Sequence, residues 1–136
     1  MTDANPRDLL RNAKVIAVVG CSANPSKPAH RVPAELLEYG YDIRPVNPRF
    51  DGDFLGRVVH KSLAEVQGRI DIVDVFRPSE EAPDIARQAI AVGAGAIWLQ
   101  QGIVSDEARR ICEAAGVAYV EDRCMAIEAR KLRHAY

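Results

Sequence analysis

Apolar and polar residues follow one another along this chain in blocks that predict strands and helices in turn. Short, nearly uninterrupted apolar runs are typical of parallel strands that helices cover on both faces. Five such runs predict strands over residues 14–20, 41–46, 70–76, 94–99 and 117–120. Asp71 and Asp74 interrupt the third run, and a buried strand with carboxylates needs a partner for each of them.

Apolar residues at helical spacing follow most of these runs. They predict helices over residues 29–39, 79–93, 105–116 and 125–132. Ser79 and Ser105 are candidate N-caps, since acidic residues follow each of them in the first turn. Asn5 and Pro6 predict a short leading helix that covers one edge of the sheet, and residues 49–67 are predicted to be irregular.

The alternation of strands and helices predicts the α/β class, with a doubly wound, mostly parallel five-stranded sheet flanked by helices. The length favours a single domain over residues 1–136, with its core at about residues 14–132. Ligands of such sheets bind at the carboxyl ends of the strands. The loops at that edge begin at Gly20, Asn47, Phe76, Gln100 and Glu121.

The stretch at residues 15–29, VIAVVGCSANPSKPA, reads as strand, small-residue turn and helix. This arrangement directs free backbone N–H groups and a positive helix dipole at a phosphate. The dinucleotide fingerprint would need glycines at three positions that hold Gly20, Ser22 and Pro25, and the second strand ends in Asn47 rather than an acidic residue. No glycine precedes Lys27 and no Ser or Thr follows it, so a triphosphate loop is also disfavoured.

Three cations lie on the same predicted edge: Lys27, Arg49 and Arg77. Each by itself is an ordinary solvated loop cation. Together with the turn at residues 20–23 they predict a ligand that carries a diphosphate and a more distant phosphate.

Composition narrows the possible partners and compartment. The net charge of -1 offers no field for nucleic acid or an anionic membrane, and no apolar run reaches the roughly 20 residues of a membrane span. The amino-terminal segment lacks the apolar core of a signal peptide. Cys21, Cys112 and Cys124 are widely spaced and odd in number, which favours a reducing, cytoplasmic setting over disulfides or zinc, and no metal ligands are predicted.

Several ordered motifs are similar to the small stand-alone CoA-binding proteins, and through them to the CoA-binding domain at the front of the succinyl-CoA synthetase α subunit. They are VIAVVGCSANPSKPAH, YDIRPVNPRF, LGRVVHKSL, IDIVDVFRPSEEAP, IWLQQGI and VEDRC. The resemblance implies a Rossmann-like fold and a site for CoA or an acyl-CoA, bound through its phosphoadenosine-diphosphate moiety.

The resemblance also assigns positions around that ligand. Gly20, Cys21, Ser22 and Ala23 match the loop around the diphosphate, and Asn47, Pro48 and Arg49 match the loop with a phosphate-binding lysine. Phe76, Arg77 and Pro78 match the adenine side, and Leu99, Gln100, Gln101 and Gly102 match the loop beside the pantetheine arm. Lys27 completes the expected site.

The synthetase's second domain and its phosphohistidine segment have no counterpart here, so a non-catalytic binding module, either a homo-oligomer or a subunit of a partner, is the leading expectation. An enzyme that uses an acyl-CoA, or a Cys21 thiol whose pKa the helix dipole lowers, is the alternative. A nicotinamide-dependent oxidoreductase is a weaker one. A local structural role is favoured for His30, and core positions for Trp98 and Cys112.

Overall fold

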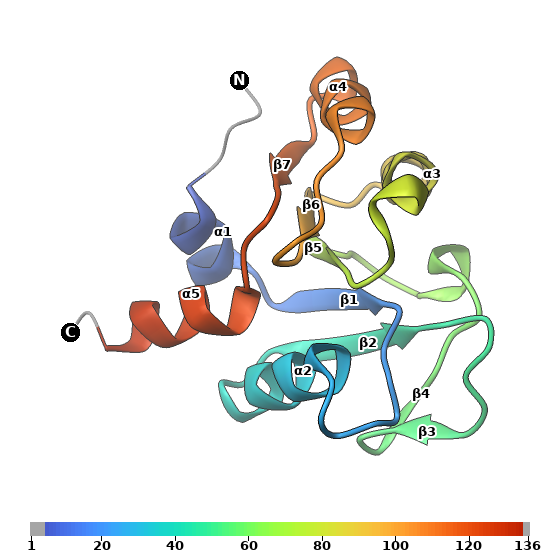
Figure 1. Ribbon diagram of the computed structural model, residues 1–136, viewed down its shortest axis with the longest axis vertical. Helices are drawn as coiled ribbons and strands as arrows, with labels where there is room; N and C mark the ends of the chain where they lie inside the picture. The colour runs from blue at the N-terminus through green and yellow to red at the C-terminus, as the bar shows by residue number, and fades with distance from the viewer. Residues whose placement is uncertain (1–4, 135–136) are drawn as a thin grey trace.

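A five-stranded parallel sheet forms the centre of the protein in the computed structural model, which describes residues 5–134 (Figure 1). The amino-terminal segment that was predicted to lack the apolar core of a signal peptide begins at residue 1, so its first four residues lie outside the described part. The strand order is β2-β1-β5-β6-β7, and every neighbouring pair is parallel. The strands are β1 (Val15–Val19), β2 (Asp42–Val46), β5 (Ile72–Val75), β6 (Ala96–Leu99) and β7 (Ala118–Val120). The predicted α/β fold class is confirmed.

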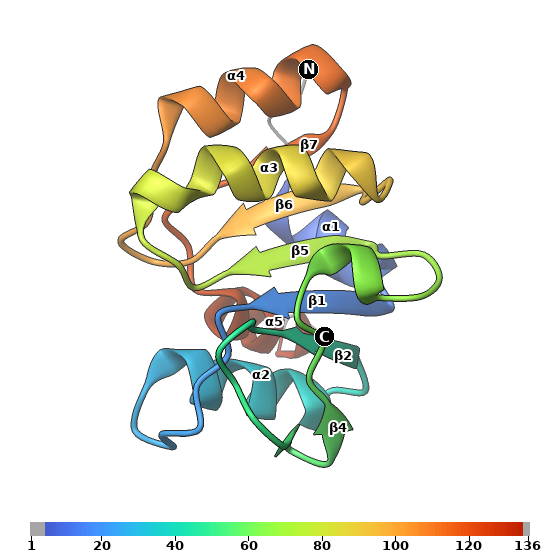
Figure 2. The same ribbon diagram turned by 90° about the vertical axis from the view of Figure 1, so that its right-hand side faces the viewer.

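Helices cover both faces of this sheet. One face carries α1 (Pro6–Asn12), α2 (Pro28–Glu38) and α5 (Met125–Arg133). The other carries α3 (Ala82–Ala91) and α4 (Asp106–Ala115). Figure 2 shows α3 in front of the strands and α5 behind them.

Alternate residues of each strand enter one of two apolar cores. On β1, Ile16 and Val18 face α2 and α5, whereas Ala17 faces α3 and η1 (Leu63–Glu65). All three are fully buried, because both faces of the central strands are covered. Trp98 of β6 is fully buried in the first core, and Cys112 of α4 in the second, so both predicted core positions are confirmed.

Two predicted caps form and one does not. The Asn5 side chain accepts the N–H groups of Arg7 and Asp8, and Ser105 accepts the N–H of Ala108. The prediction for Ser79 is wrong, since a 3₁₀ turn, η2 (Ser79–Glu81), precedes α3 and the Ser79 hydroxyl accepts the Val104 N–H instead. Helix α1 packs on the sheet face beside α5 rather than at an edge, as its buried Leu10 shows.

The segment expected to be irregular contains a small antiparallel hairpin. Its strands are β3 (Asp53–Phe54) and β4 (Arg57–Val58), joined by Leu55 and Gly56 with φ of 51° and 79°. Each strand is two residues long, too short to leave a detectable alternation of apolar and polar positions.

Asp71, which precedes β5, and Asp74, which lies within β5, have different hydrogen-bond partners. Asp71 accepts the N–H groups of Lys14 and Val15 and a hydrogen bond from Arg69. Asp74 is fully buried and accepts one hydrogen bond from the Gln100 amide at 2.6 Å.

Candidate functional site

The turn after β1 brings the backbone of Gly20 against the segment that follows β5. Gly20 has a φ of 94°, and its N–H donates to the Val46 carbonyl at 2.9 Å. A Cβ at this position would lie 2.9 Å from the Arg77 Cδ and 3.3 Å from the Phe76 carbonyl carbon. Both the conformation and the close approach therefore require glycine, and Arg77 lies across the turn.

Two side chains hold the loop between β1 and α2. The Asn47 amide donates to the Cys21 carbonyl at 2.9 Å, and His30 Nδ1 donates to the Ser22 carbonyl at 2.9 Å. The Ser22 N–H donates to the Ala29 carbonyl at 3.3 Å. Asn47 thus acts on the loop itself, and the local role expected of His30 is confirmed.

Helix α2 presents fewer free amides than the sequence suggested. Pro28 occupies its first position and has no N–H, and the Lys27 carbonyl accepts the N–H groups of His30 and Arg31. Within residues 5–134 the Ala29 N–H has no acceptor. Two cations, Lys27 and Arg31, line the same groove as Ala29.

A groove of about 610 Å³ lies between the amino-terminal halves of α2 and α5, and we call it the α2–α5 groove. Glu35 and Arg130 bridge the two helices with hydrogen bonds of 3.0 and 2.7 Å. These bonds lower the pKa of Glu35, so the bridge is an ion pair. The lining residues are Lys27, Pro28, Ala29, Arg31, Val32, Glu35, Phe76, Gln100, Gln101, Ile103, Cys124, Ala126, Ile127 and Arg130.

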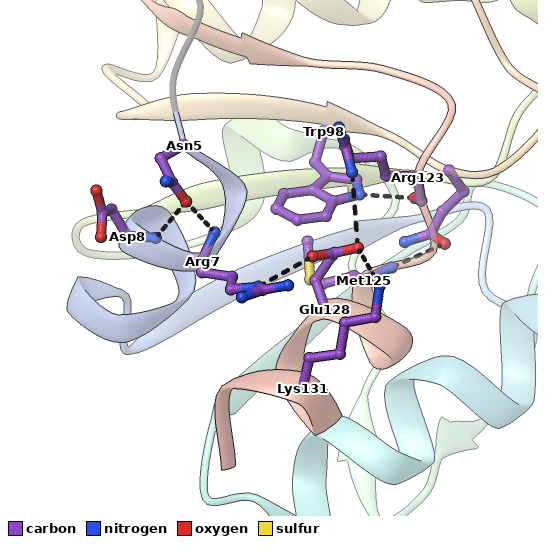
Figure 3. Close-up of polar contacts among 9 residues, drawn as sticks. Asn5, Arg7, Asp8, Trp98, Arg123, Met125, Glu128 and Lys131 are labelled. Carbon is purple, nitrogen blue, oxygen red and sulfur yellow. Dashed lines mark hydrogen bonds and ion pairs between the residues drawn. The ribbon is translucent and has the colours of Figure 1, made fainter. Parts of the chain in front are cut away.

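Helix α5, which forms one wall of this groove, is held in place by hydrogen bonds and ion pairs with β6, α1 and the loop before α5 (Figure 3). The Trp98 indole donates to the Arg123 carbonyl at 2.8 Å, which fixes the loop before α5 to β6. Within α5, the nearly buried Glu128 carboxylate lies 3.6 Å from Arg7, 3.7 Å from Arg123 and 3.8 Å from Lys131. These contacts tie α1, the loop before α5 and α5 together, so the wall has a defined position.

A second groove, of about 620 Å³, lies on the other side of the Gly20 turn, and we call it the β2–α3 groove. Arg77 donates to both carboxylate oxygens of Glu81, at 3.0 and 2.6 Å, which lowers the pKa of Glu81. Arg49 lies close enough to lower that pKa further. The lining residues are Val19, Gly20, Val46, Asn47, Pro48, Arg49, Lys61, Ser62, Leu63, Arg77, Glu80, Glu81, Asp84, Ile85 and Gln88.

The sequence model of the CoA binding domain matches residues 14–130. The chain belongs to this family. It is 39% identical to the uncharacterized protein YneT of Bacillus subtilis over 124 residues, which are 91% of each chain. It is also similar to a solved protein of Thermus thermophilus, cell-free ID.343, with 41% identity, a TM-score of 0.89, and 95% and 99% of the two chains covered.

The chain is also similar to part of a larger protein. The α subunit of the ADP-forming acetate–CoA ligase I of Pyrococcus furiosus is 33% identical over 86 residues, which are 60% of this chain and 19% of that one. The chain thus spans about a fifth of that ligase subunit. The resemblance to CoA-binding domains found in the motifs is confirmed.

The two grooves bring together nine of the fifteen residues expected at the ligand site of this CoA-binding domain. Lys27, Phe76, Gln100 and Gln101 line the α2–α5 groove, and Gly20, Asn47, Pro48, Arg49 and Arg77 line the β2–α3 groove. Phe76 and Arg77, expected together on the adenine side, thus lie in different grooves. The other six line neither groove: Cys21, Ser22, Ala23, Pro78, Leu99 and Gly102.

Sequence reasoning missed several groove residues. Arg31 carried a usable signal, because it lies in the first turn of the helix that the sequence predicts from residue 29. Arg130 and Ile127 gave none, since nothing local in α5 tells which of its exposed residues face α2. Lys61 lies within the segment expected to be irregular, and the sequence did not show that it lines the same groove as Arg49.

Two of the three cysteine thiols are buried, and the third lies at the α2–α5 groove. Burial raises the pKa of Cys21 to about 11, the opposite of the direction expected from the helix dipole, and raises that of Cys112 to about 11. Cys124 is half-buried, precedes the first residue of α5, and lines the α2–α5 groove. The suggested reactive thiol at Cys21 therefore loses its physical basis.

Within residues 5–134, no three His, Cys, Asp or Glu side chains are placed to hold a metal ion. No helix in that range combines the length and the apolar character that crossing a bilayer takes.

Proposed function

We infer that this protein binds CoA or an acyl-CoA through the phosphoadenosine-diphosphate moiety and acts as a binding module. One observation carries the proposal: in a chain that belongs to the CoA-binding domain family, two grooves of similar volume flank the Gly20 turn and the start of α2. CoA has two chemically different ends joined by a diphosphate, which suits two grooves that are lined by the adjacent residues Phe76 and Arg77.

The diphosphate would lie at the first turn of α2. The Ala29 N–H supplies a donor there, and the helix dipole favours an anion. Lys27 and Arg31, which line the same groove as Ala29, supply two positive charges in place of the several amides that the sequence suggested. In this proposal charge-assisted hydrogen bonds therefore carry more of the binding than backbone amides do.

The outlying phosphate would lie in the β2–α3 groove near Arg49, Lys61 and Arg77. Arg77 must exchange part of its contact with Glu81 for the phosphate. Both side chains of that pair are about half exposed, so breaking it costs little. The α2–α5 groove would take the pantetheine arm, since Val32, Phe76 and Ile127 give it apolar walls.

Binding rather than catalysis fits the positions of Cys21, Asp74 and His30. Cys21 and Asp74 are buried and line neither groove, and His30 is engaged with the Ser22 carbonyl. We place the activity in the cytoplasm, because the three cysteines are free thiols.

Calorimetric titration with CoA, dephospho-CoA and NAD tests the proposal. We expect CoA to bind most tightly, dephospho-CoA more weakly because one phosphate is missing, and NAD weakest. Equal, weak binding of all three would overturn the proposal. Mass spectrometry of a ligand that co-purifies with the native protein would identify an acyl group.

A charge-matched pair of variants tests the diphosphate site. Arg31→Ala should weaken CoA binding about tenfold or more, because it removes a cation beside the Ala29 N–H. Arg110→Ala removes the same charge from the exposed surface of α4 on the opposite face and should leave binding unchanged. Equal affinities of the two variants would contradict the placement of the diphosphate.

A further inference from the structure

A buried hydrogen-bond relay links Gln100, which lines the α2–α5 groove, to β5 and to the first residue of α5. Asp74 accepts a hydrogen bond from the Gln100 amide nitrogen at 2.6 Å, and the Gln100 amide oxygen accepts the Met125 N–H at 3.4 Å. Asp74 and Met125 are fully buried, and only 4% of the Gln100 surface is exposed. The relay therefore connects the middle of β5, the loop after β6 and the first residue of α5.

The relay leaves one carboxylate oxygen without a partner. Asp74 Oδ2 is buried and has no hydrogen bond among the described residues. Burial raises the pKa of Asp74 to about 8, opposed by the hydrogen bond from Gln100, so the carboxyl is neutral at pH 7. A buried acid with an unpaired oxygen is a cost to the fold that apolar packing at this position would avoid.

We propose that Asp74 is a positioning residue for the groove: by accepting from Gln100 it fixes the side-chain amide so that its oxygen receives the N–H of Met125 and holds the first turn of α5 against the loop after β6. This inference rests on the proposed function, in which that groove takes the pantetheine arm. Asp74 does not touch the ligand.

The orientation of an amide side chain explains why the acid matters. Gln100 has a donor end and an acceptor end, and only one orientation suits both neighbours. Without an acceptor at position 74, the Gln100 nitrogen is buried unpaired, or the amide turns over and presents a donor to the Met125 N–H. Either outcome loosens the start of α5, which carries Cys124 and Ala126 on the groove wall.

Three variants separate this role from a general effect on the core. Asp74→Val removes the acceptor, and Asp74→Asn keeps an acceptor oxygen of the same shape. Val73→Ala perturbs the same strand but faces α3 and α4 in the other core. Each variant is titrated with CoA and with adenosine 3′,5′-bisphosphate, which carries no diphosphate and no pantetheine arm. Amide hydrogen exchange at Met125 is measured in parallel.

We expect Asp74→Val to bind CoA about tenfold more weakly, to bind adenosine 3′,5′-bisphosphate like the wild type, and to exchange the Met125 amide faster. Asp74→Asn should restore CoA affinity to near the wild-type value, and Val73→Ala should keep it. Should Asp74→Val not fold, Asp74→Ala, which also removes the acceptor, replaces it with the same expectations.

Different results would overturn this inference and the proposed function. Wild-type CoA affinity retained in Asp74→Val, or equal loss for both ligands, would overturn the positioning role and leave CoA binding intact. Absence of CoA binding by the wild-type protein would overturn the proposed function itself.

Discussion

Arg77 lies across Gly20, with its Cδ only 2.9 Å from the point where a Cβ on Gly20 would stand. The same guanidinium is held by Glu81 on the far side, at 3.0 and 2.6 Å. The turn after β1, the segment after β5 and the turn before α3 are therefore held against one another, where Phe76 lines one groove and Arg77 the other. Substitutions at Gly20 and Glu81 test this relationship separately.

Gly20→Ala should destabilise the protein by about 2 kcal/mol or more, because it combines a left-handed conformation with a clash against Arg77. Gly40→Ala is the matched control, since Gly40 has a similar φ of 92° and nothing within 4 Å of the added Cβ. Urea unfolding of both variants measures the difference. Equal losses would show that the close approach of Arg77 contributes nothing.

Glu81→Gln should raise CoA affinity by about two- to fivefold, because it releases Arg77 for a ligand phosphate. Stability should change by less than about 1 kcal/mol, since both side chains of the pair are about half exposed. Glu80→Gln changes the net charge equally in the same groove and has no hydrogen bond or ion pair to Arg77. If Glu80→Gln raised the affinity as much, net charge and not the release of Arg77 would be the cause.

Asp74 should make stability depend on pH. Its folded pKa of about 8 lies above the ordinary value of 3.8, so between these values the folded protein keeps a proton that the unfolded chain has lost. The contribution of the protonated Asp74 carboxyl to the free energy of unfolding is therefore full below pH 3.8 and is lost as the pH rises through about 8. Relative to the wild type, Asp74→Asn should gain on the order of a few kcal/mol across this window.

Urea unfolding of both proteins at a series of pH values from about 4 to 9 measures this gain. A difference between the two proteins that stays constant over the series would mean that Asp74 is already ionised at neutral pH.

Thiol alkylation should proceed in a fixed order. Cys124 should react with iodoacetamide first, and Cys21 and Cys112 much more slowly, because burial raises the pKa of both. Mass spectrometry of the digested protein gives the three rates. Cys21→Ser should leave the fast reaction unchanged and Cys124→Ser should abolish it.

Bound CoA should slow the reaction at Cys124, since this residue lines the groove proposed for the pantetheine arm. Unchanged alkylation under saturating CoA would show that the ligand does not enter that groove.

The sequence by itself determined the five strands of the parallel sheet, their order along the chain and the class of fold. Apolar runs such as residues 15–19 are local signals, and burial on both faces of a parallel sheet leaves them nearly continuous. The caps at Asn5 and Ser105 were also predictable, because a capping side chain reaches only two or three residues along its own helix. The Gly20 turn was predictable for the same reason, because strand, glycine and helix follow one another within residues 15–29.

Only the tertiary structure decided which residues share a groove and which face a core. Cys21 follows the turn but enters the core, whereas Cys124, a hundred residues further on, lines the α2–α5 groove beside Lys27. Phe76 and Arg77 are neighbours in sequence and lie in different grooves. The pairing of Glu35 with Arg130 joins two helices that are far apart in the chain. Contacts of this kind depend on how separate elements pack, and no local pattern of residues encodes that packing.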